Sequence, residues 1–94
     1  MEMELPLTEI QENVLCFAAE FIEENNYPPT IEEIQDGVKL SNPGSVYRAL
    51  QGLENKNYIH KKSDVARGLR LTKLGEKYMP SNQANLPEEE TENT

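Results

Sequence analysis

The sequence predicts a small α+β domain in which three helices precede a two-stranded antiparallel hairpin. Apolar residues recur at spacings of three and four in three successive segments, which indicates helices with one buried face. Two short segments with some alternation follow near residues 58–71, separated by turn residues, which indicates the hairpin. With 94 residues, 36% of them hydrophobic, and no Trp, the chain can bury one modest, mainly aliphatic core.

The first two helices have recognisable starts and ends. Thr8 is a suitable N-cap for the first helix, which "NNYPP" stops near Asn25. "TIEE" has the pattern of a capping box, so the second helix should begin after Thr30, with Glu33 as the partner of this cap, and end near Val38. The apolar stripe of the first helix would consist of Ile10, Val14, Phe17, Ala18 and Phe21.

A short turn, "KLSN", leads to the third helix. Pro43 suits the first helical position, and the helix should run to about Asn55. Its core-facing residues would be Val46, Leu50 and Leu53. "YIHKK" and "RGLRL" would form the two strands, and "TKLGEKYM" a last helical turn capped by Thr72. Residues 1–79 are therefore expected to form one domain, and residues 80–94, which lack apolar periodicity, a disordered acidic tail.

Charge is divided unevenly along the chain. The formal net charge is −8, yet residues 1–38 hold ten acidic residues and no Lys or Arg. Residues 39–77 hold all nine basic residues and only three acidic ones, and four basic residues gather in "KKSDVARGLRL". Such asymmetry says more about a partner than the total charge does.

Several classes of protein are not expected. The single cysteine, Cys16, cannot form an internal disulfide, which fits a location in the cytoplasm. No stretch approaches the roughly 18 apolar residues of a membrane span, and the N-terminus has no signal-peptide pattern, so we expect no membrane partner. His60 is the only histidine, and no Cys cluster, nucleophile arrangement or phosphate-binding loop is visible. We therefore expect no metal, no cofactor, no catalytic residues and no enzyme activity.

The order of the predicted elements is that of a winged helix-turn-helix. In such a domain the helix after the turn enters the major groove of double-stranded DNA, where its N-terminal half meets base edges. The hairpin, or wing, lies on the adjacent backbone or in the minor groove. Both placements need positive charge on the DNA-facing side and tolerate acidic residues on the far side, and the charges of this sequence are divided in that way.

Three segments carry a resemblance to a known family. "LTEIQENVLCFAAEFIEENNYPPTIEEI" is similar to the opening of the LexA repressor's DNA-binding domain, with its Leu-Thr and its Pro-Pro-Thr before the second helix. "SNPGSVYRALQGLENKNYI" resembles that family's recognition helix and exit turn, and "ARGLRL" resembles its wing. The resemblance covers about residues 5–71 and implies a winged helix-turn-helix that binds operator DNA as a repressor.

The sequence also departs from the family pattern. LexA-like repressors carry a second domain with a serine–lysine self-cleaving site, and the sequence ends before such a domain could form, so we expect a DNA-binding domain alone. The family's recognition helix uses an Asn and a Glu to help read its operator, and Gly44, Tyr47 and Arg48 stand at those places here. Recognition of the family's usual operator is therefore not implied, although Asn42 matches a base-contacting Ser of the family.

The expected DNA-contacting residues lie at the start of the second helix, on the third helix and in the wing. Arg48 and Asn42 are the expected base readers, because Arg pairs well with guanine and Asn with adenine. Arg67 is the leading wing candidate for a phosphate or minor-groove contact. The full set is Thr30, Asn42, Gly44, Ser45, Tyr47, Arg48, Gln51, Lys61, Lys62 and Arg67. The alternatives are an ordinary solvated helix face, a solubilising hairpin and, for Thr30, a purely structural cap.

Two functions follow from these observations. The first is a sequence-specific regulator of transcription, in the simplest case a repressor, that binds double-stranded DNA and acts as a homodimer because one small module reads few base pairs. The second is a winged-helix protein-interaction module whose acidic first helix and tail bind a basic protein partner. The net charge of −8 favours this second function, because a typical DNA-binding domain is basic, often with a pI above about 9.

Overall fold

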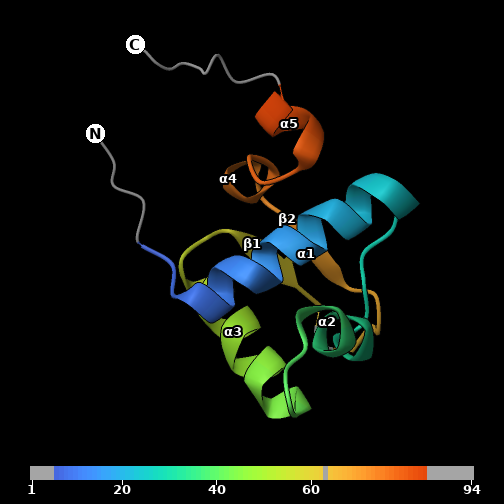
Figure 1. Cartoon of the computed structure of the whole chain (residues 1–94), viewed down its shortest axis with the longest axis vertical. Coiled ribbons are helices and arrows are strands. Elements are labelled where there is room, and N and C mark those ends of the chain that lie inside the picture. The colour runs from blue at the N-terminus through green and yellow to red at the C-terminus, as the bar shows by residue number, and fades with distance from the viewer. Residues whose placement is uncertain (1–5, 63, 85–94) are drawn as a thin grey trace.

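The computed structural model describes residues 6–62 and 64–84. Its elements, in chain order, are α1 (Glu9–Asn25), α2 (Ile31–Val38), α3 (Pro43–Asn55), β1 (Ile59–Lys61), β2 (Leu69–Leu71), α4 (Lys73–Glu76) and α5 (Pro80–Ala84) (Figure 1). The predicted α+β order of three helices followed by an antiparallel hairpin is confirmed.

α1 and α2 begin at the capping residues that the sequence indicates, Thr8 and Thr30. Thr8 and Thr30 each accept a hydrogen bond from the backbone N–H at the third helical position, and the side chain at that position accepts from the cap's own N–H. Asn42 caps α3 with its side-chain oxygen alone, which accepts from the N–H of Ser45. Asn26 and Lys39, which end α1 and α2, adopt the left-handed conformation that terminates helices.

One hydrophobic core joins the three helices and the hairpin. α1 packs against both α2 and α3, and α3 packs against β1. The core cluster consists of Val14, Leu15, Ala18, Ile34, Val46, Ala49, Leu50, Leu53, Tyr58, Ile59 and Leu69. The predicted stripe on the first helix was partly wrong, because Ile10 is 44% exposed while Leu15 and Ala19 are buried. Two helices cover α1, so its buried face is wider than the single stripe that its periodicity suggests.

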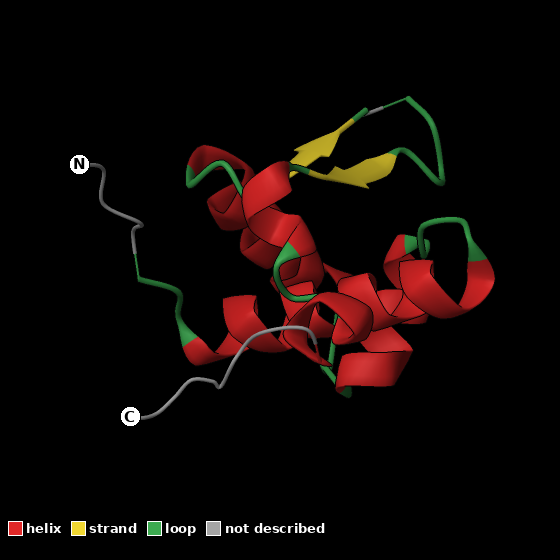
Figure 2. Cartoon of the chain, turned by 90° about the horizontal axis from the view of Figure 1, so that it is seen from above, coloured by secondary structure: helices red, strands yellow, loops and turns green. Residues whose placement is uncertain are grey.

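The hairpin is short, and residues 62–68 connect its two strands. Its antiparallel pairs are Ile59–Leu71, His60–Arg70 and Lys61–Leu69. Ile59 and Leu69 are buried, whereas both residues of the middle pair are exposed. A Cβ atom at Gly68 would lie 2.7 Å from the backbone oxygen of Lys62, so the turn requires glycine at this position. The hairpin extends along one side of the helices, as Figure 2 shows.

α4 and α5 extend the domain past the hairpin and lie against α1 (Figure 1). Thr72 caps α4, as predicted. The domain boundary predicted at residue 80 needs correction, because Pro80–Ala84 is helical rather than part of a disordered tail. Ser81 donates two hydrogen bonds to Glu23 of α1, through its N–H at 3.0 Å and through its hydroxyl at 2.9 Å. The sequence did not indicate this helix, because polar contacts of this kind leave no periodic pattern of apolar residues. Residues 85–94, the rest of the predicted tail, lie outside the described residues.

Candidate nucleic-acid interface

The turn between α2 and α3 sets the direction in which α3 leaves the core. Lys39 reverses the chain with a φ of 62°. The N–H of Leu40 then donates to the carbonyl of Gln35 at 3.0 Å, and the side chain of Gln35 donates back to the carbonyl of Leu40 at 3.4 Å. The side chain of Leu40 also packs against the core. Polar and apolar contacts together therefore hold the helix-turn-helix in one geometry.

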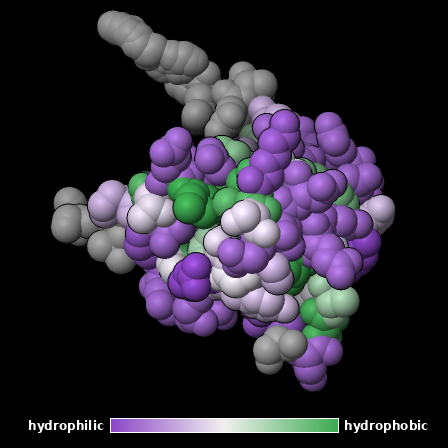
Figure 3. All heavy atoms as spheres, turned by 60° about the horizontal axis from the view of Figure 1, so that its bottom comes forward, coloured by the Kyte–Doolittle hydropathy of each residue, from purple (hydrophilic) through white to green (hydrophobic). Residues whose placement is uncertain are grey.

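α3 has one buried face and one exposed face. The buried face consists of Val46, Ala49, Leu50 and Leu53. The predicted DNA-contacting residues Asn42, Tyr47, Arg48 and Gln51 are all exposed, and Gly44 and Ser45 are half-buried at the start of the helix. Figure 3 brings the lower side of Figure 1 forward and shows a mostly hydrophilic surface with small, separate hydrophobic patches. The structure therefore brings six of the predicted residues together at the start and along the outer side of α3.

Arg48 and Tyr47 flank this exposed face. Arg48 has no ion pair with any residue that the structure describes, so its guanidinium donors are available. Tyr47 is 52% exposed, and the Nζ atom of Lys61 lies over its ring, 5.5 Å from the centroid. This cation–π contact links α3 to β1 and places a positive charge beside an exposed aromatic ring.

Two of the predicted polar residues already form hydrogen bonds within the protein. The Oδ1 atom of Asn42 accepts from the N–H of Ser45 at 3.1 Å, and Gln51 donates to Asn55 at 3.2 Å. Reading adenine with Asn requires its oxygen as acceptor and its nitrogen as donor at the same time. Because the cap occupies Oδ1 in part, Asn42 is better placed to donate through Nδ2 than to read adenine with both atoms.

The two wing lysines differ in their surroundings. Lys61 is half-buried against the ring of Tyr47, whereas Lys62 is exposed. A groove lined by α2, α3 and the wing separates α3 from the wing tip, where Val65 is 47% exposed. Lys62 is therefore the wing residue with the most accessible positive charge on the predicted list.

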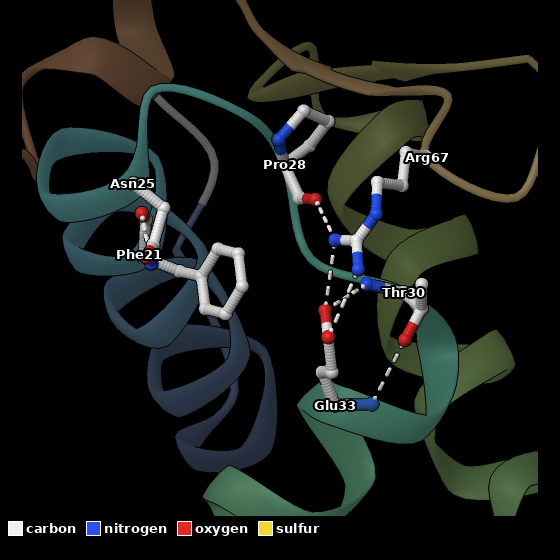
Figure 4. A network of polar contacts seen from close by, with 6 residues as sticks. All are labelled: Phe21, Asn25, Pro28, Thr30, Glu33 and Arg67. Carbon is white, nitrogen blue, oxygen red and sulfur yellow. Dashed lines mark hydrogen bonds and ion pairs between the residues drawn. The ribbon is translucent and has the colours of Figure 1, made fainter.

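Arg67, the leading wing candidate, is paired with other residues of the protein at its surface, where its side chain is 39% exposed. Its Nη1 donates to the carbonyl of Pro28 at 2.7 Å and to Glu33 Oε1 at 2.9 Å, and its Nη2 donates to Glu33 Oε2 at 3.0 Å (Figure 4). The guanidinium also lies over the ring of Tyr27, with Cζ 4.7 Å from the centroid. We call Tyr27, Pro28, Glu33 and Arg67 the Arg67 clamp. This arrangement does not favour the predicted contact of Arg67 with DNA.

Glu33 belongs both to the Arg67 clamp and to the cap of α2. Its Oε1 accepts from the N–H of Thr30 at 2.9 Å, while its own N–H donates to Thr30 Oγ1 at 3.1 Å. Hydrogen bonds from Arg67 and from the Thr30 N–H lower the pKa of Glu33, and the same carboxylate raises the pKa of Arg67. Thr30 thus has the structural role of a cap, and its contact with a phosphate stays a prediction.

Sequence reasoning did not identify the partners of Arg67. The ion pair joins residues 34 positions apart, and the carbonyl of Pro28 carries no sequence signal. Glu33 was assigned only to the capping box. A Glu that completes a capping box has a second carboxylate oxygen that the cap does not use. This free acceptor was the one feature of the sequence that could have indicated a further partner for Glu33.

Other chemical sites receive no support within residues 6–62 and 64–84. No group of three or more His, Cys, Asp or Glu side chains there could hold a metal ion. No helix in the same part of the chain combines the length and the apolar character needed to cross a membrane. Burial and the neighbouring Glu12 and Glu20 raise the pKa of the Cys16 thiol, which disfavours the reactive thiolate.

A helix-turn-helix whose second helix exposes a polar face beside a two-stranded wing defines the winged helix-turn-helix class of DNA-binding domain. Residues 3–68 match the family described as LexA DNA binding domain, and the chain belongs to that family. The resemblance inferred from the three sequence segments is therefore confirmed. The matched region contains the three main helices, β1 and the turn of the wing with Arg67.

Several curated relatives are LexA repressors of bacteria. The chain is 38% identical over 65 residues to the LexA repressor of Carboxydothermus hydrogenoformans, covering 69% of this chain and 32% of the relative. It is 42% identical over 67 residues to the LexA repressor of Thermotoga maritima, covering 71% and 34%. With LexA repressor 1 of Geobacter sulfurreducens it shares 41% identity over 61 residues, covering 65% and 30%. The chain matches only about a third of the length of these relatives.

Proposed function

We propose that the chain is a sequence-specific regulator of transcription that binds double-stranded DNA and represses by occupying a promoter. The observation that carries the proposal is the outer side of α3, which exposes Tyr47, Arg48 and Gln51 beside the wing lysines in a domain of the LexA DNA-binding family. α3 would enter the major groove, and the wing would lie on the backbone or in the minor groove. Such a regulator would act in the cytoplasm.

The predicted site residues take different roles in this proposal. Arg48 is the main base reader, because its guanidinium is exposed at the N-terminal half of α3. Gly44 has no side chain and lets a base or phosphate approach the backbone there. Tyr47 would contact a thymine methyl group or a phosphate, and Lys62 a phosphate. Asn42 and Ser45, at the start of the helix, would position it on the backbone.

We also propose that the regulator binds DNA as a homodimer. A single α3 covers few base pairs, and two-fold symmetric DNA sites are the usual match for dimers of helix-turn-helix domains. A two-fold repeat in the selected DNA would support this arrangement, whereas one isolated half-site would support a monomer.

The test is a selection of binding sites from random double-stranded DNA at low and at moderate salt. A regulator that reads sequence should enrich one motif at both salt concentrations. Weak binding without an enriched motif, falling steeply with salt, would leave only non-specific attraction to phosphates. Absence of any binding at low salt would contradict the proposed function.

A second candidate function is a protein-interaction module, and the surface of α1 favours it. Glu9, Glu12, Glu20 and Glu24 are exposed and fall on one side of α1 at helical spacing. Residues 1–38 contain no Lys or Arg, so this side would bind a basic partner. Replacing two of these Glu residues by Gln should weaken such a partner's binding. The same change should leave sequence preference on DNA unaltered.

A further inference from the structure

We propose that Arg67 is a positioning residue, which holds the wing against the start of α2 so that the wing and α3 can meet DNA together. This inference rests on the proposed function, because the orientation of the wing matters for DNA binding only if the domain binds DNA. It replaces the direct phosphate contact that the sequence suggested for Arg67. The role of the Arg67 clamp in the free protein can be tested without DNA.

The Arg67 clamp occupies most of the hydrogen-bond donors and one face of the Arg67 guanidinium. Of its five N–H donors, three are directed at Pro28 and Glu33, and Tyr27 covers one face of its plane. The paired carboxylate offsets the positive charge. For Arg67 to reach a phosphate, it would have to leave a two-point ion pair and expose an unpaired Glu33 beside the DNA. A role within the protein therefore fits the geometry better than a role at the DNA.

Ile59 and Leu69 anchor the base of the wing in the core, so the Arg67 clamp acts as a tether on the exposed turn, where Val65 and Arg67 lie. Each strand has three residues, and an isolated two-stranded hairpin of this kind is marginally stable in water. Two contacts flank it: Lys61 lies over Tyr47 of α3, and Arg67 joins the residues around the start of α2. Since the turn after α2 fixes the direction of α3, a wing held on α2 is also held relative to α3.

Glu33 makes the clamp part of the helix-turn-helix. Its carboxylate caps the N–H of Thr30 and pairs with Arg67 at the same time. Replacing it by Gln keeps the capping pattern, because Gln also serves at this position of a capping box. Glu33→Gln therefore removes the charged, two-point partner of Arg67 and leaves the start of α2 formed. Glu32→Gln is the matched control, since Glu32 is exposed on the same turn and has no ion pair with a described residue.

The first experiment compares the salt dependence of DNA affinity among three variants, using the DNA motif selected with the parent. Arg67→Gln and Arg67→Lys should both bind about tenfold more weakly, as expected if the wing takes its binding position only about a tenth of the time. Their salt dependence should equal that of the parent, because no phosphate contact is lost. Lys62→Gln should flatten the slope of log affinity against log salt by about 0.9, the value for one neutralised phosphate.

Arg67→Lys separates the two roles most sharply. A lysine keeps the charge for a phosphate but cannot form the planar, two-point pair with Glu33. If Arg67→Lys binds as the parent does while Arg67→Gln flattens the salt slope, Arg67 contacts DNA and the proposal is wrong.

Glu33→Gln gives an independent test, because the two hypotheses predict opposite changes in DNA affinity. If the clamp positions the wing, Glu33→Gln should weaken binding relative to Glu32→Gln, and combining it with Arg67→Gln should add little further loss. If Glu33 instead keeps Arg67 away from DNA, Glu33→Gln should tighten binding relative to Glu32→Gln and steepen the salt slope. That result would overturn the proposal.

Hydrogen exchange in the free protein separates failure of the clamp from failure of the proposed function. In the parent, the N–H groups of Lys62, Val65 and Gly68 form hydrogen bonds within the wing. Arg67→Gln and Glu33→Gln should speed their exchange several-fold, while the amides of α1 and α3 exchange as in the parent. Unchanged exchange in the wing would refute the clamp even if DNA binding fell. Faster exchange in a protein that binds no DNA would keep the clamp and reject the function.

Discussion

Replacing Arg48 by Ala should remove sequence preference at one base pair while leaving the fold unchanged. Arg48 is exposed on α3 and has no ion pair with a described residue, so its removal should change the free energy of unfolding by less than about 0.5 kcal/mol. Loss of a two-point contact with guanine costs about 1–3 kcal/mol of binding free energy. The affinity for the selected motif should therefore fall by about 5- to 150-fold.

The assay is fluorescence anisotropy with the selected motif and with each of its single base-pair variants. The parent should bind more weakly whenever an important base pair is changed. Arg48→Ala should bind equally well whichever base pair stands at one of these positions, and it should keep the parent's preferences at the others. Arg70→Ala is the matched control, because Arg70 is an exposed arginine whose side chain lines a groove with Ile22 and Tyr27, on the α1 side of the wing. It should keep the full pattern of preferences.

Two results would refute the assignment of Arg48. An equal loss of affinity for every sequence would make Arg48 a phosphate contact, and the position of α3 in the groove would need revision. Binding by Arg48→Ala that equals that of the parent and of Arg70→Ala would show that DNA meets another face of the domain.

Three other predictions concern the fold, the pH dependence and the tail. Gly75→Ala places a Cβ against the backbone carbonyl of Tyr58 and should lower the free energy of unfolding by about 1–3 kcal/mol, whereas Gly44→Ala, facing only side chains, should melt near the parent temperature. Because the folded protein lowers the pKa of Glu33, the stability that this carboxylate adds is present above its ordinary pKa of 4.5 and is lost as the pH falls below that value. Denaturant titrations should show the difference between the parent and Glu33→Gln shrinking over that range, and a constant difference would contradict the pairing. Deleting residues 85–94 removes four Glu and keeps the contact of Ser81, so it should raise non-specific DNA affinity at low salt without changing the melting temperature. A fall of many degrees would show instead that this segment packs against the domain.

The features that the sequence predicted well are those that depend on neighbouring residues. A capping box requires only a cap and a residue three positions later, so the starts of α1 and α2 could be placed from Thr8 and Thr30 alone. The entry to α3 followed from Pro43, which suits the first helical position. Once these starts are known, the spacing of apolar residues gives the order of helices and wing, and with it the class of domain.

The features that it missed depend on contacts between distant residues. The pairing of Arg67 with Glu33 spans 34 positions, and the contact of Ser81 with Glu23 spans 58. Neither pair belongs to a repeating pattern, because each depends on how α1, α2 and the wing are placed in space. The exposure of Ile10 has the same origin, since only the packing of α2 and α3 on α1 decides which side of that helix is buried.

This distinction changes how the basic segment "KKSDVARGLRL" contributes to binding. Four of its residues are basic, but the charge of Arg67 is paired with Glu33, and Lys61 lies over the ring of Tyr47. Arg70 lies on the α1 side of the wing, so Lys62 is the one residue of the four that is both unpaired in the described structure and expected to face the DNA. Each phosphate contact contributes about 0.9 to the slope of log affinity against log salt. A wing with one or two such contacts gives a shallow slope and weak non-specific binding. If the domain binds an operator as proposed, we expect its affinity to depend mainly on base contacts from α3, the helix that carries Arg48.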